Sequence, residues 1–265
     1  DYVINDIDIR PDYDADSSQA MKYIGDVIDY HEVGLVRWGG TFLQAEYMTE
    51  NLTAFINVTT ALSGYKRINY FEDSESDWRW TPGFTIKLGG NYNIGPRMNA
   101  FFNLGYISRV RAFRYFFKGY TTEWQDETDN ERVKAIETGY NYHSPRFTVN
   151  VNTYFTQWEN KPTSRVYSTH ILGTGEPGYD PDDPENNNIR VYADIPGMDA
   201  LHMGIEVDFI YKILRNLDLQ GLFSFGDWTW DKRVTGLQFY NYDTHQSVEK
   251  IINFDARGIH VGDAA

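Results

Sequence analysis

The sequence predicts an all-β protein, an antiparallel up-and-down transmembrane β-barrel, from three observations. Apolar and polar residues alternate with a period of two over long runs, as they do in strands that have one apolar face. Short turns alternate with long connections along the chain, which is the layout of outer-membrane barrels. Aromatic residues make up 16% of the chain, and such barrels carry Tyr and Trp in girdles at both membrane interfaces.

The alternation is clearest in Leu201–Lys212, where the odd positions are apolar and the even positions are mostly polar or small. We expect this run to form a hairpin with Leu217–Gly226. In chain order, the expected strands are Leu43–Met48, Leu52–Leu62, Trp80–Tyr92, Met98–Tyr106, Ile136–Tyr142, Phe147–Phe155, Leu201–Lys212 and Leu217–Gly226. A tilted strand needs ~9–11 residues to cross a bilayer, whereas strands of soluble proteins average ~5–6. Most of these runs have the longer, membrane-spanning length.

The connections between the expected strands fall into two classes. The short turns are Thr49–Asn51, Asn93–Arg97, Ser144–Arg146 and Arg215–Asn216. The long segments are Gly64–Arg79, Ser108–Glu131 and Asn160–Asp199. If the strands form a meander, all short turns lie on one side of the membrane and all long segments on the other.

The alternative fold is a soluble β-sandwich or a lipocalin-like barrel, which turns its apolar face inward. Alternation alone does not decide which face is outside. Loops of this length and the aromatic residues near the strand ends favour the membrane barrel. The residues that we expect in the interfacial girdles are Trp80, Tyr92, Tyr106, Trp158, Trp228 and Trp230.

Composition excludes several classes of protein. The chain has 24 Lys and Arg against 38 Asp and Glu, a net charge of -14, which argues against nucleic acid or an anionic membrane surface as the partner. Because Cys is absent, disulfides, Cys-type zinc sites and thiol catalysis are excluded. The sequence contains no run of about 18 apolar residues, so no transmembrane helix is predicted. The acidic N-terminal residues Asp1–Arg10 lack the features of a signal peptide.

Two neighbouring segments carry a family resemblance. Phe101–Arg109 resembles a strand of TonB-dependent outer-membrane receptors of the Bacteroidetes type, and Arg132–Tyr140 resembles the segment that follows it in those barrels. The resemblance continues in the expected order through Asn150–Trp158, Leu201–Asp208, Gly226–Trp230 and Phe254–Ala264. Together these segments span most of residues 33–265, and their order and spacing carry the resemblance.

The resemblance implies that residues 1–265 are a segment of a single receptor barrel domain of about 22 strands. No plug domain, TonB box or closing C-terminal strand is visible in the sequence. Such a segment leaves two unpaired edges, which are costly in lipid, so we expect the rest of the barrel to exist elsewhere. The implied location is the outer membrane of a Gram-negative bacterium.

The implied function is active import of a scarce extracellular solute, driven by a TonB complex through a plug outside this chain. Implied partners are a small-molecule, glycan or peptide ligand, outer-membrane lipid and a surface lipoprotein, with no nucleic acid and no cofactor. The alternative is a passive porin-like barrel or a structural or adhesin barrel. An enzyme is not expected, because Gly-x-Ser-x-Gly is absent and the His residues are scattered, so no catalytic residue is named.

The longest connection, Lys161–Asp199, supplies the candidate ligand-binding residues. Its side chains mix aromatic and polar groups, as ligand sites do. The candidates are Tyr167, His170, Tyr179, Asp180, Asp182 and Asp183. Two alternatives stay open: an aromatic loop that packs on its neighbours, and an acidic loop that is solvated. Clustered carboxylates suit calcium, but this run lacks the glycine and final Glu of an EF-hand.

The even positions His202, Glu206 and Asp208 share one strand face, which we expect to be the lumen-facing one. A metal or acid–base role is the alternative to an ordinary polar lumen wall, and no metal ligand is assigned. The basic residues Arg109, Arg111 and Arg114 either contact an anionic group such as a lipopolysaccharide phosphate or anchor the loop to acidic neighbours.

Overall fold

The computed structural model describes residues 31–118, 121–125, 129–163, 166–195, 197–242 and 247–262. The acidic N-terminal segment Asp1–Arg10 and the last residues of the Phe254–Ala264 segment lie outside the described residues. Within the described part, a single 3₁₀ turn, η2 (Phe113–Tyr115), is the only helical element. None of the described helical structure is long and apolar enough to cross a bilayer.

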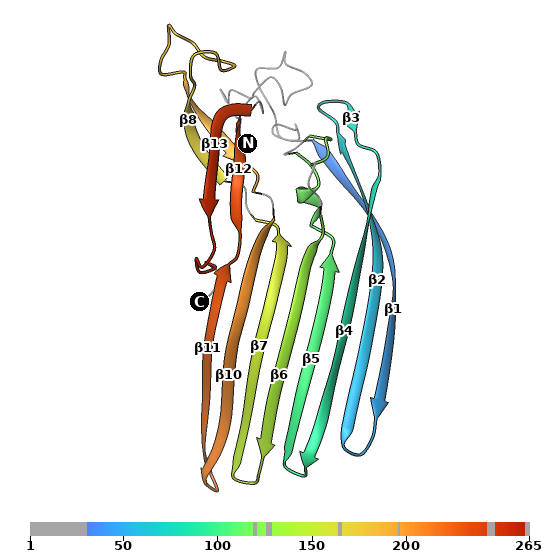
Figure 1. Cartoon of the computed structure of the whole chain (residues 1–265). Coiled ribbons are helices and arrows are strands. Elements are labelled where there is room, and N and C mark those ends of the chain that lie inside the picture. Colours follow the sequence, from blue (N-terminus) through green and yellow to red (C-terminus); the bar gives the residue numbers. More distant parts are fainter. Residues whose placement is uncertain are drawn as a thin grey trace, which may run out of the picture. The chain divides into compact units, whose positions relative to one another are not determined.

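Eight long strands follow one another in one sheet (Figure 1). In sheet order they are β1 (Glu32–Met48), β2 (Leu52–Asn69), β4 (Arg79–Gly95), β5 (Met98–Arg109), β6 (Glu131–His143), β7 (Phe147–Lys161), β10 (Met198–Leu214) and β11 (Leu217–Trp230). The pairs from β5 to β11 are antiparallel, and the two-residue β3 (Ser74–Glu75) pairs with β2. Each expected strand lies within one of these eight, so the predicted meander is confirmed.

The long connection Asn160–Asp199 is more ordered than the sequence predicted. It contains β8 (Val166–Ile171) and β9 (Asn188–Ala193), which pair with each other. After β11, β12 (Arg233–Asn241) and β13 (Ser247–Asp255) form a second hairpin, and these strands make a separate sheet in the order β13-β12-β9-β8. All four strands are short, and β12 and β13 pair with register shifts, so their alternation is weak in the sequence.

The chain divides into two compact units. Unit 1 consists of the described residues of 1–42, 59–84 and 110–130, and unit 2 contains the remaining described residues. In unit 1, the buried Tyr65, Phe116 and Phe117 form a small core, with Phe113 and Trp124 packed against it. Tyr65 stacks on Phe116 with 4.6 Å between ring centroids.

The main core of unit 2 lies under the four-stranded sheet rather than along the long strands. Its buried residues are Leu172, Val191, Ala193, Met198, Val234, Leu237, Phe239, Val248 and Ala256. Met198 is the first residue of β10, and the others lie in or directly after the strands of β8–β9 and β12–β13, so the two hairpins share one core. Side chains also join the two outer strands of this sheet: Lys250 Nζ of β13 donates to Ser168 Oγ and to the Thr169 carbonyl of β8, both at 2.7 Å.

Candidate functional site

Cross-strand register sorts the residues of unit 2 onto two faces of the long sheet. On one face, Asn99, Asn141, Asn150 and Asp208 are partners on four successive strands. Asn141 Nδ2 donates to Asn99 Oδ1 at 2.7 Å, and Asn150 Nδ2 donates to Asp208 Oδ1 at 2.9 Å. Every second residue of each strand lies on this side of the sheet, which we call the polar face.

Glu137 connects three strands on the same face. It accepts hydrogen bonds from Asn103 Nδ2 at 3.0 Å and from Asn152 Nδ2 at 2.9 Å. Carboxylate acceptors make such bonds stronger than amide–amide bonds, so this triplet orders β5, β6 and β7 side by side. Leu222, opposite Asp208, is an exposed apolar exception on this face, and nothing in the structure explains it.

The predicted lumen-facing residues all lie on the polar face. Asp208 contacts Asn150, as described above. Glu206 lies opposite Asn152 of β7 and Ser224 of β11. His202 is further along β10, opposite Trp228 of β11. The structure therefore groups these three residues on one wall, but it gives them different surroundings.

An aromatic cluster occupies the end of the polar face that adjoins the long connections. It consists of Tyr154, Trp158, His202, Trp228 and Trp230. The His202 ring lies 6.2 Å from the Trp158 ring and 6.4 Å from the Trp228 ring, and Trp228 Nε1 donates to Tyr154 Oη at 2.9 Å. The structure therefore places Trp158, Trp228 and Trp230 on the polar face, whereas the residues of a membrane girdle would lie on the apolar face. Trp158 lies in steps of two from Asn152 on β7, and Trp228 and Trp230 lie in steps of two from Ser224 on β11. This alternation within each strand is the signal that could have placed them on the polar face.

A cation and two unpaired atoms complete the aromatic cluster. Lys161 Nζ lies 4.7 Å from the Trp158 ring centroid and 5.6 Å from that of Trp230, within the range of cation–π attraction. Trp158 Nε1 and His202 Nε2 are buried and have no hydrogen-bond partner in the described part of the chain. Buried polar atoms are normally paired, so these two are candidates for contact with a bound group.

The opposite, apolar face carries the residues that the alternation predicts to face lipid. Met203, Ile205, Phe223 and Phe225 lie here as neighbours on β10 and β11, and all four are exposed. From Leu201 to Tyr211 the strand advances ten residues at ~3.4 Å each, which at a tilt of ~40° gives a height of about 25 Å. The apolar band of outer-membrane barrels has a height of about 25 Å.

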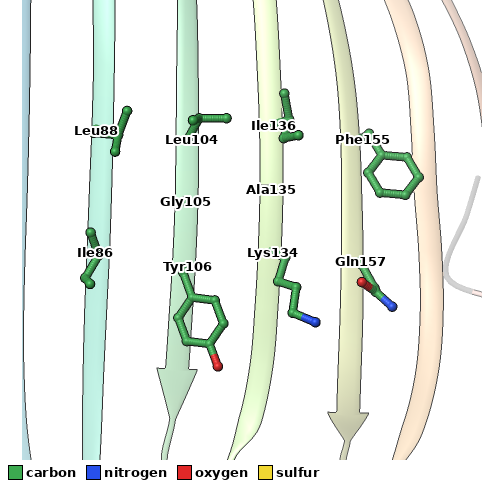
Figure 2. A pocket seen from close by; sticks show the side chains of 10 residues that line it. All are labelled: Ile86, Leu88, Leu104, Gly105, Tyr106, Lys134, Ala135, Ile136, Phe155 and Gln157. Carbon is green, nitrogen blue, oxygen red and sulfur yellow. The ribbon is translucent and has the colours of Figure 1, made fainter.

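A groove lies on this apolar face, between side chains of β4, β5, β6 and β7 (Figure 2). Leu88, Leu104, Ile136 and Phe155 form one row of its walls, and Lys134 and Gln157 belong to the next. By the alternation of the strands, Glu137 and Asn103 lie on the opposite face from these two rows. The groove is not part of the aromatic cluster.

His170, a candidate ligand-binding residue of the longest connection, makes its described contacts within the protein itself. His170 Nε2 lies 2.9 Å from both carboxylate oxygens of the buried Glu176. Glu176 also accepts from the backbone amides of Gly173, at 2.5 Å, and Glu249, at 2.6 Å. Burial alone would raise the pKa of Glu176, but the bonds from these amides and from His170 outweigh it and hold the pKa below its usual range. This carboxylate joins the tip of β8–β9 to β13.

Aromatic and acidic candidates on the same tip differ in exposure. Tyr179 is partly buried against the shared core, whereas Tyr167 is 59% exposed, with its ring 6.0 Å from that of Tyr242. Asp180 Oδ1 accepts from the Asp182 amide, and Asp183 Oδ1 accepts from the Asn186 amide. These carboxylates therefore cap turns. Among the described residues, no three His, Asp or Glu side chains are grouped to hold a metal ion. Ligand contact by these candidates stays a prediction.

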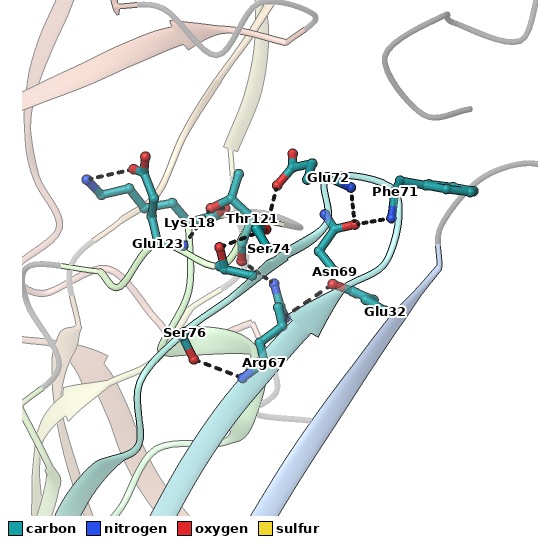
Figure 3. A network of polar contacts seen from close by, with 11 residues as sticks. Glu32, Arg67, Asn69, Phe71, Glu72, Ser74, Ser76, Lys118, Thr121 and Glu123 are labelled. Carbon is teal, nitrogen blue, oxygen red and sulfur yellow. Dashed lines mark hydrogen bonds and ion pairs between the residues drawn. The ribbon is translucent and has the colours of Figure 1, made fainter. Parts of the chain in front are cut away.

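Of the predicted basic residues, Arg109 contacts an acidic neighbour, as one of the two interpretations expected, whereas Arg114 contacts the adjacent Tyr115. Arg109 forms an ion pair with the buried Glu131 at 2.5 Å, and Arg114 Nη2 donates to Tyr115 Oη at 2.7 Å. In unit 1, Arg67 is buried in a polar network with Glu32 and Ser76 (Figure 3). Its guanidinium also lies 4.5 Å from the Phe117 ring centroid. These cations hold the connections in place.

No protein-family model matches the chain, and no curated protein matches it. Solved structures do. A structure titled "Copper transporter OprC" matches with a TM-score of 0.54 and 13% identity, over 78% of this chain and 32% of that one. The FrpB iron transporter from Neisseria meningitidis (F3-3 variant) matches with a TM-score of 0.51 and 12% identity, over 76% of this chain and 27% of that one.

The chain has the fold of a transmembrane β-barrel segment. It spans about a third of the length of the two similar structures, both of which are transporters rather than enzymes. Identities of 12% and 13% support the fold, and the solutes in the titles belong to those proteins.

Proposed function

We propose that this chain is part of an outer-membrane importer, and that its polar face lines the lumen through which the solute passes. The observation that carries the proposal is the polar face, from Asn99 to the aromatic cluster, backed by an apolar face of membrane-spanning height. In membrane barrels the lumen side is polar and the lipid side apolar. Likeness to two metal transporters supports import as the function.

The solute enters this lumen past the aromatic cluster. Trp158, Trp228 and Trp230 offer ring faces, and Trp158 Nε1 offers an unpaired donor. Ligand sites combine aromatic surface with a few oriented polar groups, which is the composition here. The four-stranded sheet of β8, β9, β12 and β13 lies on the side of the long connections, which the proposal makes extracellular, and its exposed Tyr167 is available for first contact.

The energy source follows from the sequence resemblance. A large barrel with a polar lumen would leak unless it is plugged, and transporters of about 22 strands carry such a plug. We propose that a plug outside this chain couples the barrel to a TonB complex, in a receptor of the Bacteroidetes type with a surface lipoprotein as a further partner. A passive porin-like barrel would instead admit small solutes without an energy source.

The test compares energised and de-energised cells that produce the full-length protein. Accumulation of copper and of iron is the first measurement, because the similar structures are transporters of these metals. Active import predicts that a protonophore abolishes accumulation of the cognate solute, while entry of a small hydrophilic antibiotic stays at the level of cells without the protein. Antibiotic entry that rises with the protein and ignores the protonophore would establish a passive pore instead.

The aromatic cluster is tested in the same cells by Trp158→Phe, which keeps a ring but removes the unpaired N–H. Uptake should decrease if this donor contacts the solute. Trp80→Phe is a matched control, because Trp80 is an exposed indole outside the cluster. Equal uptake by both variants and the parent would exclude a contact between the Trp158 N–H and the solute.

A further inference from the structure

The groove on the apolar face is the feature that solute import leaves unexplained. It has a volume of about 390 Å³ and is lined by Ile86, Leu88, Leu104, Gly105, Tyr106, Lys134, Ala135, Ile136, Phe155 and Gln157 (Figure 2). Its apolar walls are exposed: Ile136 to 51% and Phe155 to 40% of their surface. A hollow of this kind in a lipid-facing surface fits an acyl chain.

The chemistry of the groove changes step by step along the strands. Register sets Leu104, Ile136 and Phe155 in one row across β5, β6 and β7. One step toward the long connections, the row is Tyr106, Lys134 and Gln157. The order is therefore hydrocarbon first and then hydroxyl, ammonium and amide, which is the order of groups in a membrane lipid from its tail to its head.

The next row adds a second cation. Ser108, Arg132 and Glu159 are partners there. Lys134 Nζ lies 2.5 Å from Glu159 Oε1, and Arg132 Nη1 lies 3.7 Å from Glu159 Oε2. Two cations share one carboxylate, so this patch has an excess of one positive charge on a chain of net charge -14. Both cations remain nearly half exposed, at 45% and 43% of their side chains.

We propose that this groove binds one phosphate-bearing lipid of the outer leaflet. An acyl chain occupies the apolar rows, and Lys134 with Arg132 contacts the phosphate. Charge complementarity identifies the occupant, because a zwitterionic or neutral lipid would gain little from the excess cation, and guanidinium and ammonium groups are the usual partners of phosphate. The proposal rests on the membrane placement of the proposed function, but not on transport.

The experiment uses the full-length protein in detergent. Dilauroyl phosphatidic acid is titrated, and saturable binding is followed by the rise in unfolding temperature and by native mass spectrometry. We expect binding of phosphatidic acid at least tenfold tighter than of dilauroyl phosphatidylcholine. Inorganic phosphate at millimolar concentration should not compete, because it lacks the acyl chain; competition would show a free-phosphate site and overturn the lipid assignment.

Variants separate the groove from general charge effects. Replacing Lys134 and Arg132 together by Gln should weaken phosphatidic acid binding at least tenfold, and Lys134→Arg should retain most of it. Lys87→Gln is the matched control, because Lys87 lies between Ile86 and Leu88 in β4 and so belongs to the opposite face. Heat-resistant migration of each variant shows that its barrel is folded.

Two further results would overturn the proposal. One is equal affinity for the two lipids in the parent protein. The other is an equal loss of affinity in Lys87→Gln and in the double variant. Failure of the uptake experiment would leave this result untouched, because lipid binding in detergent needs no solute, plug or energy source.

Discussion

Replacement of Glu176 by Gln should loosen the contact between the tip of β8–β9 and β13. The carboxylate accepts two backbone amides and lies within bonding distance of His170. Gln keeps one oxygen but turns an NH₂ group toward donors, so at least one buried donor loses its partner. A hydrogen bond to a charged group contributes about 1.5–3 kcal/mol. We therefore expect the local opening free energy of this contact to decrease by about 2 kcal/mol, within that range.

Hydrogen exchange of the full-length protein measures this opening. A change of about 2 kcal/mol corresponds to a roughly 30-fold loss of protection, and it should be confined to the amides of Gly173 and Glu249 and their neighbours. Glu185→Gln is the control, because Glu185 is an exposed carboxylate of the same tip. Unchanged protection at Gly173 and Glu249 in Glu176→Gln would refute the role assigned to this carboxylate.

The same contact has a predicted pH dependence. Because the pKa of Glu176 is lowered in the folded protein, its stabilising contribution is fully present above the unfolded-state pKa of ~4.3. The contribution is lost as the pH falls through the folded-state value. Protection of the Glu249 amide, corrected for intrinsic exchange, should therefore be constant from neutral pH to about pH 5 and decrease only in stronger acid, in the parent and not in Glu176→Gln.

Three further predictions concern the two faces, the strand packing and the hairpins. Spin labels along Leu201–Phe209 should show lipid contact at odd positions and water contact at even ones, and the reverse phase would mean that the apolar face is internal. Gly139→Ala should destabilise the barrel by roughly 1–3 kcal/mol, as overpacking does, because the new Cβ would lie 2.2 Å from the Phe101 ring. Gly95→Ala is the control, because its Cβ would meet nothing within 4 Å, and equal unfolding temperatures of the two variants would contradict the prediction. Replacing Lys161–Asp199 by a short Gly/Ser turn should leave barrel insertion intact and lower solute uptake. It should also expose β12–β13 to proteolysis, because the shared core is lost, and a protease-resistant β12–β13 would show that the two hairpins are independent.

Strand position was predictable from the sequence because the long strands alternate between an apolar and a polar face. Leu201–Lys212 shows this alternation, and β10 contains it. By contrast, β8 and β9 are six residues each, too short for a period of two to stand out. Their stability comes from a core shared with β12 and β13, which lie far along the chain, and no local pattern reports such a partner.

The candidate site was predictable only in part. Parity placed His202, Glu206 and Asp208 on one face, but the tryptophans near strand ends were assigned by residue type, which does not distinguish lumen from lipid. Counting in steps of two along β11 from Ser224, which lies opposite Glu206, would have placed Trp228 on the polar face. Counting through the β10–β11 hairpin would not, because a register shift between Lys212 and Leu214 displaces the pairing by one residue. The burial of Glu176 could not have been foreseen, because its partner Glu249 is 73 residues away and contributes only a backbone amide.

The hydrogen bonds at the two outer strands of the four-stranded sheet also affect whether another chain can add to its edges. An outer strand with free amides and carbonyls is a template onto which another chain can add. Here Lys250 donates a hydrogen bond to the Thr169 carbonyl of one outer strand, and Glu176 accepts one from the Glu249 amide of the other. Each is a charged side chain that an incoming strand would have to displace. A neighbouring copy, or an extended peptide in the medium, would therefore have to displace a charged side chain to add a strand at either of these two positions.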